Sequence, residues 1–264
     1  MQVGKRHLVL RQDPDIVLGD RLQYRGQFAP TTTITVASVA GTDTDREAAL
    51  RLIRDVCWLL SLASMSRVVP YQYEYPPGHV VKSWGVPGVC GTSWPLLDIR
   101  RGATVRQFVE TAFPAFRRLK SRRRLREVFD TLISAEAGNH PVELSLLTAY
   151  ICLEMLKDTW ARSMGIPFAK GHFWRVNPRT GKRTRYGFEP MLRSMMRQVG
   201  MRPGLKLVGR YRNALVHSGG LRLSRQTKSR AYDTAQRLCR EYLLRLLGYK
   251  GPYVIWGELR PGAL

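Results

Sequence analysis

The chain has 264 residues, 44% of them hydrophobic, which is enough for one large domain or two smaller ones and excludes a disordered protein. Its 43 lysines and arginines outnumber its 20 aspartates and glutamates, giving a formal net charge of +23. Because cationic side chains gain affinity by displacing counterions from phosphates, this excess predicts a polyanionic partner such as RNA, DNA or an anionic membrane. The alternatives are an acidic protein partner or a generally basic proteome.

Cysteine usage and apolar runs exclude further classes. Cys57, Cys90, Cys152 and Cys239 lie far apart without the paired spacings of metal sites, and at least three stand in apolar runs, which predicts buried thiols in a reducing compartment. The longest apolar runs are too short for a membrane span or carry a charge, and the N-terminus lacks a secretory signal pattern. No nucleotide-binding loop occurs. We therefore expect a cytoplasmic protein with no membrane span, metal or cofactor.

The N-terminal part predicts strands followed by a helix. The segments HLVLR, RLQYRGQF and TTTITVASV cluster β-branched and apolar residues within the first 40 positions. Thr44 and Glu47 then have capping-box spacing before an apolar stripe of helical period, which predicts a core helix. Residues 68 to 99 mix tyrosines with prolines and glycines, as is typical of short extended pieces and loops. Residues 1 to 138 are thus expected to form a mixed α/β region.

Two helices separated by a proline are predicted next. Thr104 and Gln107 have the spacing to cap the first helix, which is expected to end near Phe113 because Pro114 stops or kinks it. The second helix is expected over residues 115 to 137, where apolar residues recur with helical spacing.

Two basic segments are candidates for nucleic-acid contact. The first, RRLKSRRRLR, lies at the start of the second of these helices, and its alternative role is a solvated helix face. The second, spanning residues 170 to 187, predicts a hairpin with its turn at residues 177 to 181. Its cations alternate with aromatic residues, a mixture that binds single-stranded RNA, although the aromatics could instead fold back onto the helices. The candidate contacts are Arg122, Arg123, Arg124, Lys170, Trp174, Arg179, Lys182, Arg183 and Arg185.

Four further helices are predicted in the second half of the chain. The strongest begins at Asn139 and Pro141, runs to Met164 and ends before Gly165. The others are a methionine-rich helix over residues 191 to 199, a helix from about residue 205, and a last amphipathic helix over residues 228 to 247. Residues 139 to 264 are expected to form a second, helical domain, although no flexible linker separates the two halves and they could form one compact unit.

One of these helices carries a polar cluster in the stretch RYRNALVHSGG, residues 210 to 220. Asn213 and His217 stand one above the other on a helix, whereas Arg212 lies about 140° away from His217 and reaches it only through its long side chain, a frayed helix end or a partner subunit. Imidazole can exchange a proton with a hydroxyl, and guanidinium can stabilise charge on phosphoryl oxygens. The cluster therefore suits metal-free RNA cleavage through the ribose 2′-hydroxyl. The alternative is an ordinary surface or capping pair.

The segment RNALVH, residues 212 to 217, resembles the R-N-x-x-x-H form of the Rx4-6H motif of HEPN domains. These α-helical proteins include many metal-independent RNases of defence and toxin–antitoxin systems. The resemblance extends over about residues 139 to 247, through the upstream helix LSLLTAYICLEMLKD and the final amphipathic helix. It implies a mainly α fold with a HEPN-like helical bundle in the C-terminal half. It also implies a homodimer formed through the HEPN helices and an antitoxin or defence-complex partner.

The same resemblance implies the site residues. Arg212, Asn213 and His217 are the implied catalytic set, and Arg210 satisfies the motif at its longest spacing. An acidic or polar residue of the upstream helix is expected near the motif, so we predict that Glu154 orients Arg212 or His217. A carboxylate in this apolar stretch is costly to bury without a partner, and the alternative is an outer-face position paired with Lys157.

Two rival functions remain at the level of the sequence. One is a non-catalytic nucleic-acid-binding module or ribonucleoprotein subunit, which would keep the basic charge but use His217 only structurally. The other is a protein-interaction regulator for which the basic charge is incidental. Inactive HEPN proteins exist, so a fold of this type does not decide between binding and cleavage.

Overall fold

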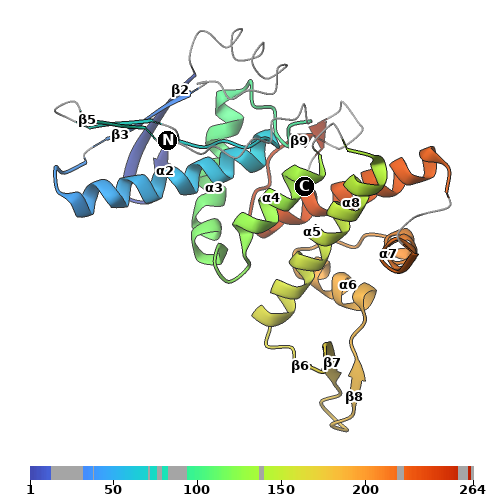
Figure 1. Cartoon of the computed structure of the whole chain (residues 1–264). Coiled ribbons are helices and arrows are strands. Elements are labelled where there is room, and N and C mark those ends of the chain that lie inside the picture. Colours follow the sequence, from blue (N-terminus) through green and yellow to red (C-terminus); the bar gives the residue numbers. More distant parts are fainter. Residues whose placement is uncertain are drawn as a thin grey trace. The chain divides into compact units, whose positions relative to one another are not determined.

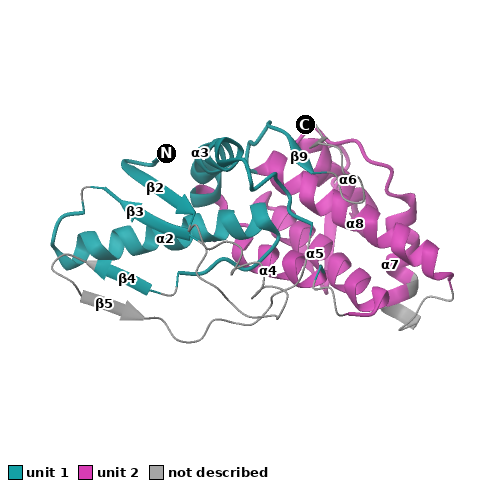
Figure 2. Cartoon of the chain, turned by 90° about the horizontal axis from the view of Figure 1, so that it is seen from above, with its two compact units in different colours: residues 1–117, 136–139, 247–264 teal, residues 118–135, 140–246 magenta. Residues whose placement is uncertain are grey.

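A computed structural model describes residues 1–12, 32–37, 39–70, 72–75, 79–82, 94–136, 140–218, 223–254 and 261–262. The chain is mainly helical with small antiparallel sheets, which confirms the predicted class at that level (Figure 1). It divides into two compact units, one of residues 1–117, 136–139 and 247–264 and the other of residues 118–135 and 140–246 (Figure 2). Compared with the expected division after residue 138, residues 118–135 join the second unit and the C-terminal tail joins the first.

The strands of the first unit form small antiparallel sheets. Strand β2 lies between β1 and β3, with Leu8 opposite Val36, and the predicted strands HLVLR and TTTITVASV correspond to β2 and β3. The segment RLQYRGQF lies outside the described residues. β4 pairs with β5, and β9 with β10. The bounds are β1 Gln2–Val3, β2 Arg6–Gln12, β3 Thr32–Val36, β4 Gln72–Tyr75, β5 His79–Lys82, β9 Tyr253–Val254 and β10 Pro261–Gly262.

Helix α2, Asp43–Ser64, begins two residues earlier than the capping-box spacing predicts. The cap is Thr42 and not Thr44, because Thr42 has extended backbone angles and its Oγ1 accepts a hydrogen bond from the Asp45 amide at 3.3 Å. The helix buries Val56, Cys57, Leu59 and Leu62, as expected for a core helix. Burial raises the pKa of the Cys57 thiol to about 12, although the Arg67 charge opposes the rise. This thiol therefore remains protonated at neutral pH.

Helix α3, Gly102–Leu119, continues through Pro114, so the expected end near Phe113 is wrong. A proline inside a helix removes one hydrogen bond and costs about 3 kcal/mol. Apolar side chains on both sides of Pro114 lie on one buried face, and each contributes about 1.5–3 kcal/mol when fully buried. The free energy gained by burying these side chains therefore outweighs the cost of a proline inside the helix. The buried residues are Phe108, Val109, Ala112, Phe113 and Phe116.

The second predicted helix, residues 115 to 137, is interrupted by a turn over residues 120 to 124. The Arg123 amide donates to the Leu119 carbonyl at 2.8 Å, the Leu125 amide donates to the Lys120 carbonyl at 2.9 Å, and Arg124 has a left-handed φ of 46°. Helix α4 then occupies Leu125–Ala135. The densest basic run of the chain thus lies at a helix end and in a turn.

Helix α5, Val142–Ser163, is the central element of the second unit, as the strongest predicted helix. It packs against α4, α6, α7 and α8 and buries Leu146, Tyr150, Leu153 and Leu156 (Figure 1). Gly165, with a φ of 67°, follows its end. The remaining helices confirm the predicted ones to within three residues at each end. They are α6 Phe188–Gln198, α7 Lys206–Ser218 and α8 Arg225–Leu246.

A three-stranded antiparallel sheet connects α5 to α6, as predicted for the basic hairpin. It consists of β6 Phe168–Ala169, β7 His172–Val176 and β8 Arg183–Arg185. Asn177 closes the turn between β7 and β8: its side-chain Oδ1 accepts from the Arg179 amide at 2.9 Å, and its carbonyl accepts from the Gly181 amide at 2.9 Å. This sheet is called the hairpin below.

Candidate functional site

Helix α7 carries every residue of the predicted motif. Val208 and Leu215 are buried, 1% and 5% exposed, and they stand seven residues apart on the face that packs against the bundle. Arg212 lies between them at helical spacing, four residues after Val208, so its position on the helix faces inward. Arg210 and Asn213 are exposed and lie on another face. Within the motif, Arg212 therefore faces the bundle, whereas Arg210 and Asn213 face outward.

Arg212 contacts a carboxylate and an aromatic ring. Its Nη2 atom lies 2.7 Å from Glu154 Oε1 of α5, and the side chains of Arg212 and Glu154 are 24% and 29% exposed. The contact is an ion pair and not an aligned hydrogen bond, since neither Glu154 Oε1 nor Arg212 Nε has a hydrogen-bond partner among the described residues. The guanidinium also lies 5.2 Å from the centre of the Phe188 ring. Packing against the ring and the carboxylate fixes the position of this cation.

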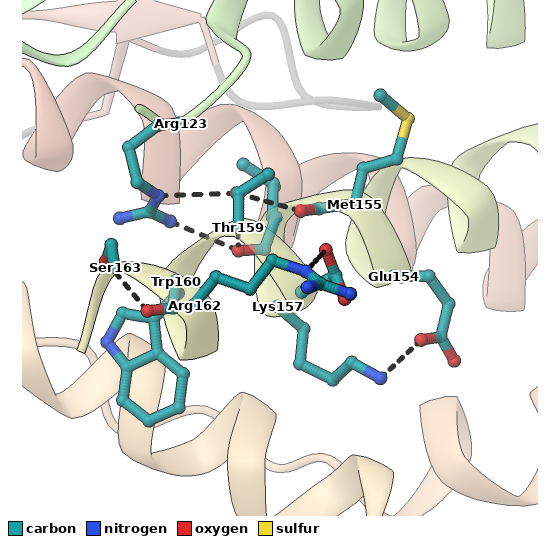
Figure 3. A network of polar contacts seen from close by, with 10 residues as sticks. Arg123, Glu154, Met155, Lys157, Thr159, Trp160, Arg162 and Ser163 are labelled. Carbon is teal, nitrogen blue, oxygen red and sulfur yellow. Dashed lines mark hydrogen bonds and ion pairs between the residues drawn. The ribbon is translucent and has the colours of Figure 1, made fainter. Parts of the chain in front are cut away.

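Glu154 bridges two cations. Its Oε2 lies 2.5 Å from Lys157 Nζ, one helical turn along α5 (Figure 3). Lys157 Nζ in turn lies 5.5 Å from the centre of the Phe188 ring. The two partners predicted as alternatives, Arg212 and Lys157, are thus both present. Because the carboxylate is paired twice and partly exposed, it avoids the cost of an isolated buried charge.

Asn213 connects the inner arginine to the outer face of α7. Its Oδ1 accepts a hydrogen bond from Arg212 Nη1 at 3.0 Å. The long side chain of Arg212 therefore reaches the residue that precedes His217 by one helical turn, which offsets part of the 140° separation between Arg212 and His217. His217 belongs to α7, but its side chain lies outside the described part of the structure, as do Gly219 and Gly220.

Phe188 completes the cluster, and the sequence did not indicate it. Phe188 is the first residue of α6, and its ring lies next to the Arg212 guanidinium of α7. The Glu189 side chain also lies close to α7, because a Cβ added to Gly209 would meet Glu189 Oε2 at 3.3 Å. The sequence pattern gives no local signal of the contact between Phe188 and Arg212.

Arg123 does not fit its predicted role in nucleic-acid contact, because it is buried. It is 3% exposed and donates hydrogen bonds to the Tyr242 hydroxyl at 2.9 Å and to the Leu156 carbonyl at 3.1 Å. It also donates to Thr159 Oγ1 at 3.3 Å (Figure 3). Burial raises the pKa of the Tyr242 hydroxyl, and the charge of Arg123 opposes that rise. The arginine connects the turn after α3 to α5 and α8.

The other predicted contact residues lie on the surface, with Trp174 half-buried. Arg122 donates to the Ser163 carbonyl, and Arg124 forms an exposed ion pair with Glu127 at 3.4 Å. Trp174 donates from Nε1 to the Ala169 carbonyl at 3.0 Å. The exposed cations of the hairpin are Lys170, Arg179, Lys182, Arg183 and Arg185.

The described residues contain no group of three or more His, Cys, Asp or Glu side chains placed to hold a metal ion. Within the same residues, every helix is either too short or too polar to cross a bilayer.

Comparison of the chain with models of protein families, with curated proteins and with solved structures found no match.

Proposed function

We propose that this protein is a metal-independent endoribonuclease of the HEPN type. The observation that carries the proposal is the ion pair between Glu154 and Arg212, which holds a motif arginine in place on the same helix as Asn213 and His217. The net charge of +23 supports a polyanionic substrate. The resemblance of the motif to HEPN ribonucleases supports a role in cell defence or in a toxin–antitoxin pair.

In the proposed reaction the ribose 2′-oxygen attacks the neighbouring phosphorus, and the bond from phosphorus to the 5′-oxygen breaks. A base takes the proton of the 2′-hydroxyl, and an acid protonates the leaving 5′-oxygen, with His217 acting as one of the two. Arg212 stabilises the negative charge on the phosphoryl oxygens, and Asn213 orients the substrate or Arg212. The products are a 2′,3′-cyclic phosphate and a 5′-hydroxyl.

The expected product ends test this function directly. Wild-type protein incubated with a mixed RNA pool in excess EDTA should release fragments with 2′,3′-cyclic phosphate and 5′-hydroxyl ends, which end-specific ligation and mass spectrometry identify. Cleavage that stops in EDTA, or fragments that carry 5′-phosphates, would contradict the proposal.

Glu154 acts in this scheme as a positioning residue for Arg212. Replacing Glu154 with glutamine should lower kcat about fivefold with little change in KM, because a partly exposed ion pair contributes about 0–1 kcal/mol and 1.4 kcal/mol corresponds to tenfold. In an Arg212→Ala background the same change should have no further effect. Single-turnover cleavage by the two single variants and the double variant measures this coupling.

The matched control is Glu241→Gln in α8. Glu241 also pairs with an arginine, Arg245, at 2.9 Å, and its side chain is 22% exposed, close to the 29% of Glu154. Its replacement removes the same charge from the same unit and should leave kcat unchanged. Equal losses in both variants would mean that net charge, and not the position of Arg212, determines the rate.

A non-catalytic nucleic-acid-binding module is the second candidate function. It is favoured by one observation: Arg212 already contacts Glu154 and Asn213, so an incoming phosphate must compete with a carboxylate for the same cation. Salt-sensitive RNA binding without cleavage by wild-type protein would select this function.

A further inference from the structure

The two faces of the hairpin have different environments. Trp174 pairs with Arg185 and Val176 pairs with Arg183 across the antiparallel strands β7 and β8. Cross-strand partners share a face, and residues two apart share a face, so these four side chains lie on one side of the hairpin. This side is called the outer face. Arg175 and Thr184 pair on the opposite, inner face, which Phe173 shares.

The inner face is fixed to the helices. Phe173 is 6% exposed and its ring lies 4.8 Å from that of Phe168, while the Arg162 guanidinium of α5 lies 4.9 Å from the Phe168 ring. Tyr186 donates to Ser194 of α6 at 2.6 Å or accepts from it. Part of the alternative expectation for this segment is therefore correct, since these aromatics fold back onto the bundle. Their contacts hold the hairpin as a defined projection, as Figure 1 shows beyond the end of α5.

The outer face partly exposes an aromatic ring next to two cations of β8. The bond from Trp174 Nε1 to the Ala169 carbonyl fixes the orientation of the indole while the residue stays partly exposed. Val176 beside it is 40% exposed, and Arg183 and Arg185 are exposed. A fixed, accessible ring flanked by guanidinium groups can stack against a base while the cations contact the adjoining phosphates.

The charge of the hairpin is unopposed. Residues 165 to 187 include no aspartate or glutamate. Elsewhere in this unit, arginines pair with carboxylates, as Arg193 does with Glu189 and Arg245 with Glu241. Within the described part of the chain, the cations of the hairpin form no ion pair. These cations are Lys170, Arg175, Arg179, Lys182, Arg183 and Arg185. Arg183 and Arg185, on the outer face, therefore remain available to an external polyanion, whereas Arg175 lies on the inner face.

We propose that the outer face of the hairpin binds single-stranded RNA, with a base stacked on Trp174 and neighbouring phosphates on Arg183 and Arg185. Single strands fit this face and duplexes do not, because the bases of a duplex already stack on each other and cannot cover the indole. The basic charge alone would serve duplex RNA or an anionic membrane equally well. The fixed indole beside two arginines is what selects an unpaired strand.

The hairpin also leads to the candidate site. Only two residues separate Arg185 from Phe188, so their Cα atoms, three positions apart, lie at most about 11 Å from each other. Phe188 lies under the Arg212 guanidinium. A strand held on the outer face thus passes close to α7. This part of the inference rests on the proposed function, because it makes the bound strand the one that α7 cleaves.

The experiment measures binding in a His217→Ala background, so that cleavage does not interfere. Fluorescence anisotropy is recorded with a labelled 12-nucleotide single-stranded RNA and with a labelled self-complementary RNA duplex. Trp174→Ala should weaken single-strand binding about 5- to 150-fold, and Trp174→Phe should recover part of the loss. Arg183→Ala with Arg185→Ala should reduce the slope of log affinity against log salt by about 1.4, the value for two single-strand phosphates.

Arg175→Ala is the matched control, because it removes a cation from the same strands on the inner face. It should change the affinity less than threefold, and far-ultraviolet circular dichroism should match among all variants. Equal affinity for the duplex, equal loss in Arg175→Ala, or retained affinity in Trp174→Ala would overturn the inference. These outcomes are independent of the nuclease: RNA cleavage by wild type without outer-face binding refutes only this inference, and binding without cleavage refutes only the proposed function.

Discussion

Replacing His217 with alanine is expected to lower the rate of RNA cleavage by about 10²- to 10⁴-fold, the usual contribution of a general acid or base. The affinity for RNA should stay within about twofold, because the cations that contact phosphates remain. Single-turnover cleavage in excess EDTA gives the rate, and the anisotropy assay gives the affinity. This combination separates a lost proton-transfer step from a lost binding contact.

His140→Ala is the matched control for this variant. His140 precedes α5 and is exposed, so its loss removes an imidazole from the same unit without touching α7. Cleavage by this control should equal that of wild type. Full activity in His217→Ala would refute the assignment of His217, and an equal loss of affinity and rate would indicate a structural role for that residue.

Replacing Arg123 with alanine is expected to lower the free energy of unfolding by about 2–4 kcal/mol. The change leaves the Tyr242 hydroxyl without its donor and opens a cavity between α5 and α8. Arg123→Met should lower the free energy of unfolding less, because methionine keeps most of the side-chain volume and the change removes the buried charge together with its hydrogen bonds. Urea unfolding followed by circular dichroism measures both variants.

Arg124→Ala supplies the comparison, since Arg124 is the next residue in the same turn and is exposed. Its replacement should change the free energy of unfolding by no more than about 0.5 kcal/mol. If Arg124→Ala destabilised the protein as much as Arg123→Ala, the conformation of the turn, and not the buried guanidinium, would account for the loss. Unchanged stability in Arg123→Ala would contradict the structural role of that side chain.

Periodicity and turn residues were sufficient to predict α5, α6, α8, the start of α7 and the hairpin. The apolar spacing of α5 and the Asn177–Gly181 turn are local signals that the structure follows. Local sequence signals gave the wrong helix ends where the burial of side chains determines the backbone conformation. Pro114 is accommodated because the helix buries apolar residues on both sides of it, and residues 120 to 124 form a turn that places Arg123 in the core.

The candidate site was predictable only in part. The position of Glu154 in an apolar helix indicated a paired carboxylate, and its contact with Arg212 agrees with that expectation. Phe188 gave no such signal, because its contact with Arg212 depends on how the connection between α6 and α7 places these two helices, which no local pattern shows. Three consecutive arginines look equivalent in sequence, yet only the fold distinguishes the buried Arg123 from the exposed Arg122 and Arg124.

The hairpin leaves and rejoins the helical bundle at neighbouring points. The Trp174 amide donates to the Pro167 carbonyl at 2.9 Å, and the Tyr186 amide donates to the Phe173 carbonyl at 2.8 Å, so the incoming and outgoing segments lie on either side of the start of β7. Lengthening such a closed excursion costs little, since loop-closure entropy grows slowly with length. Evolution can therefore exchange the hairpin, and with it the single-strand contact proposed above, while the helix that bears Arg212 stays unchanged.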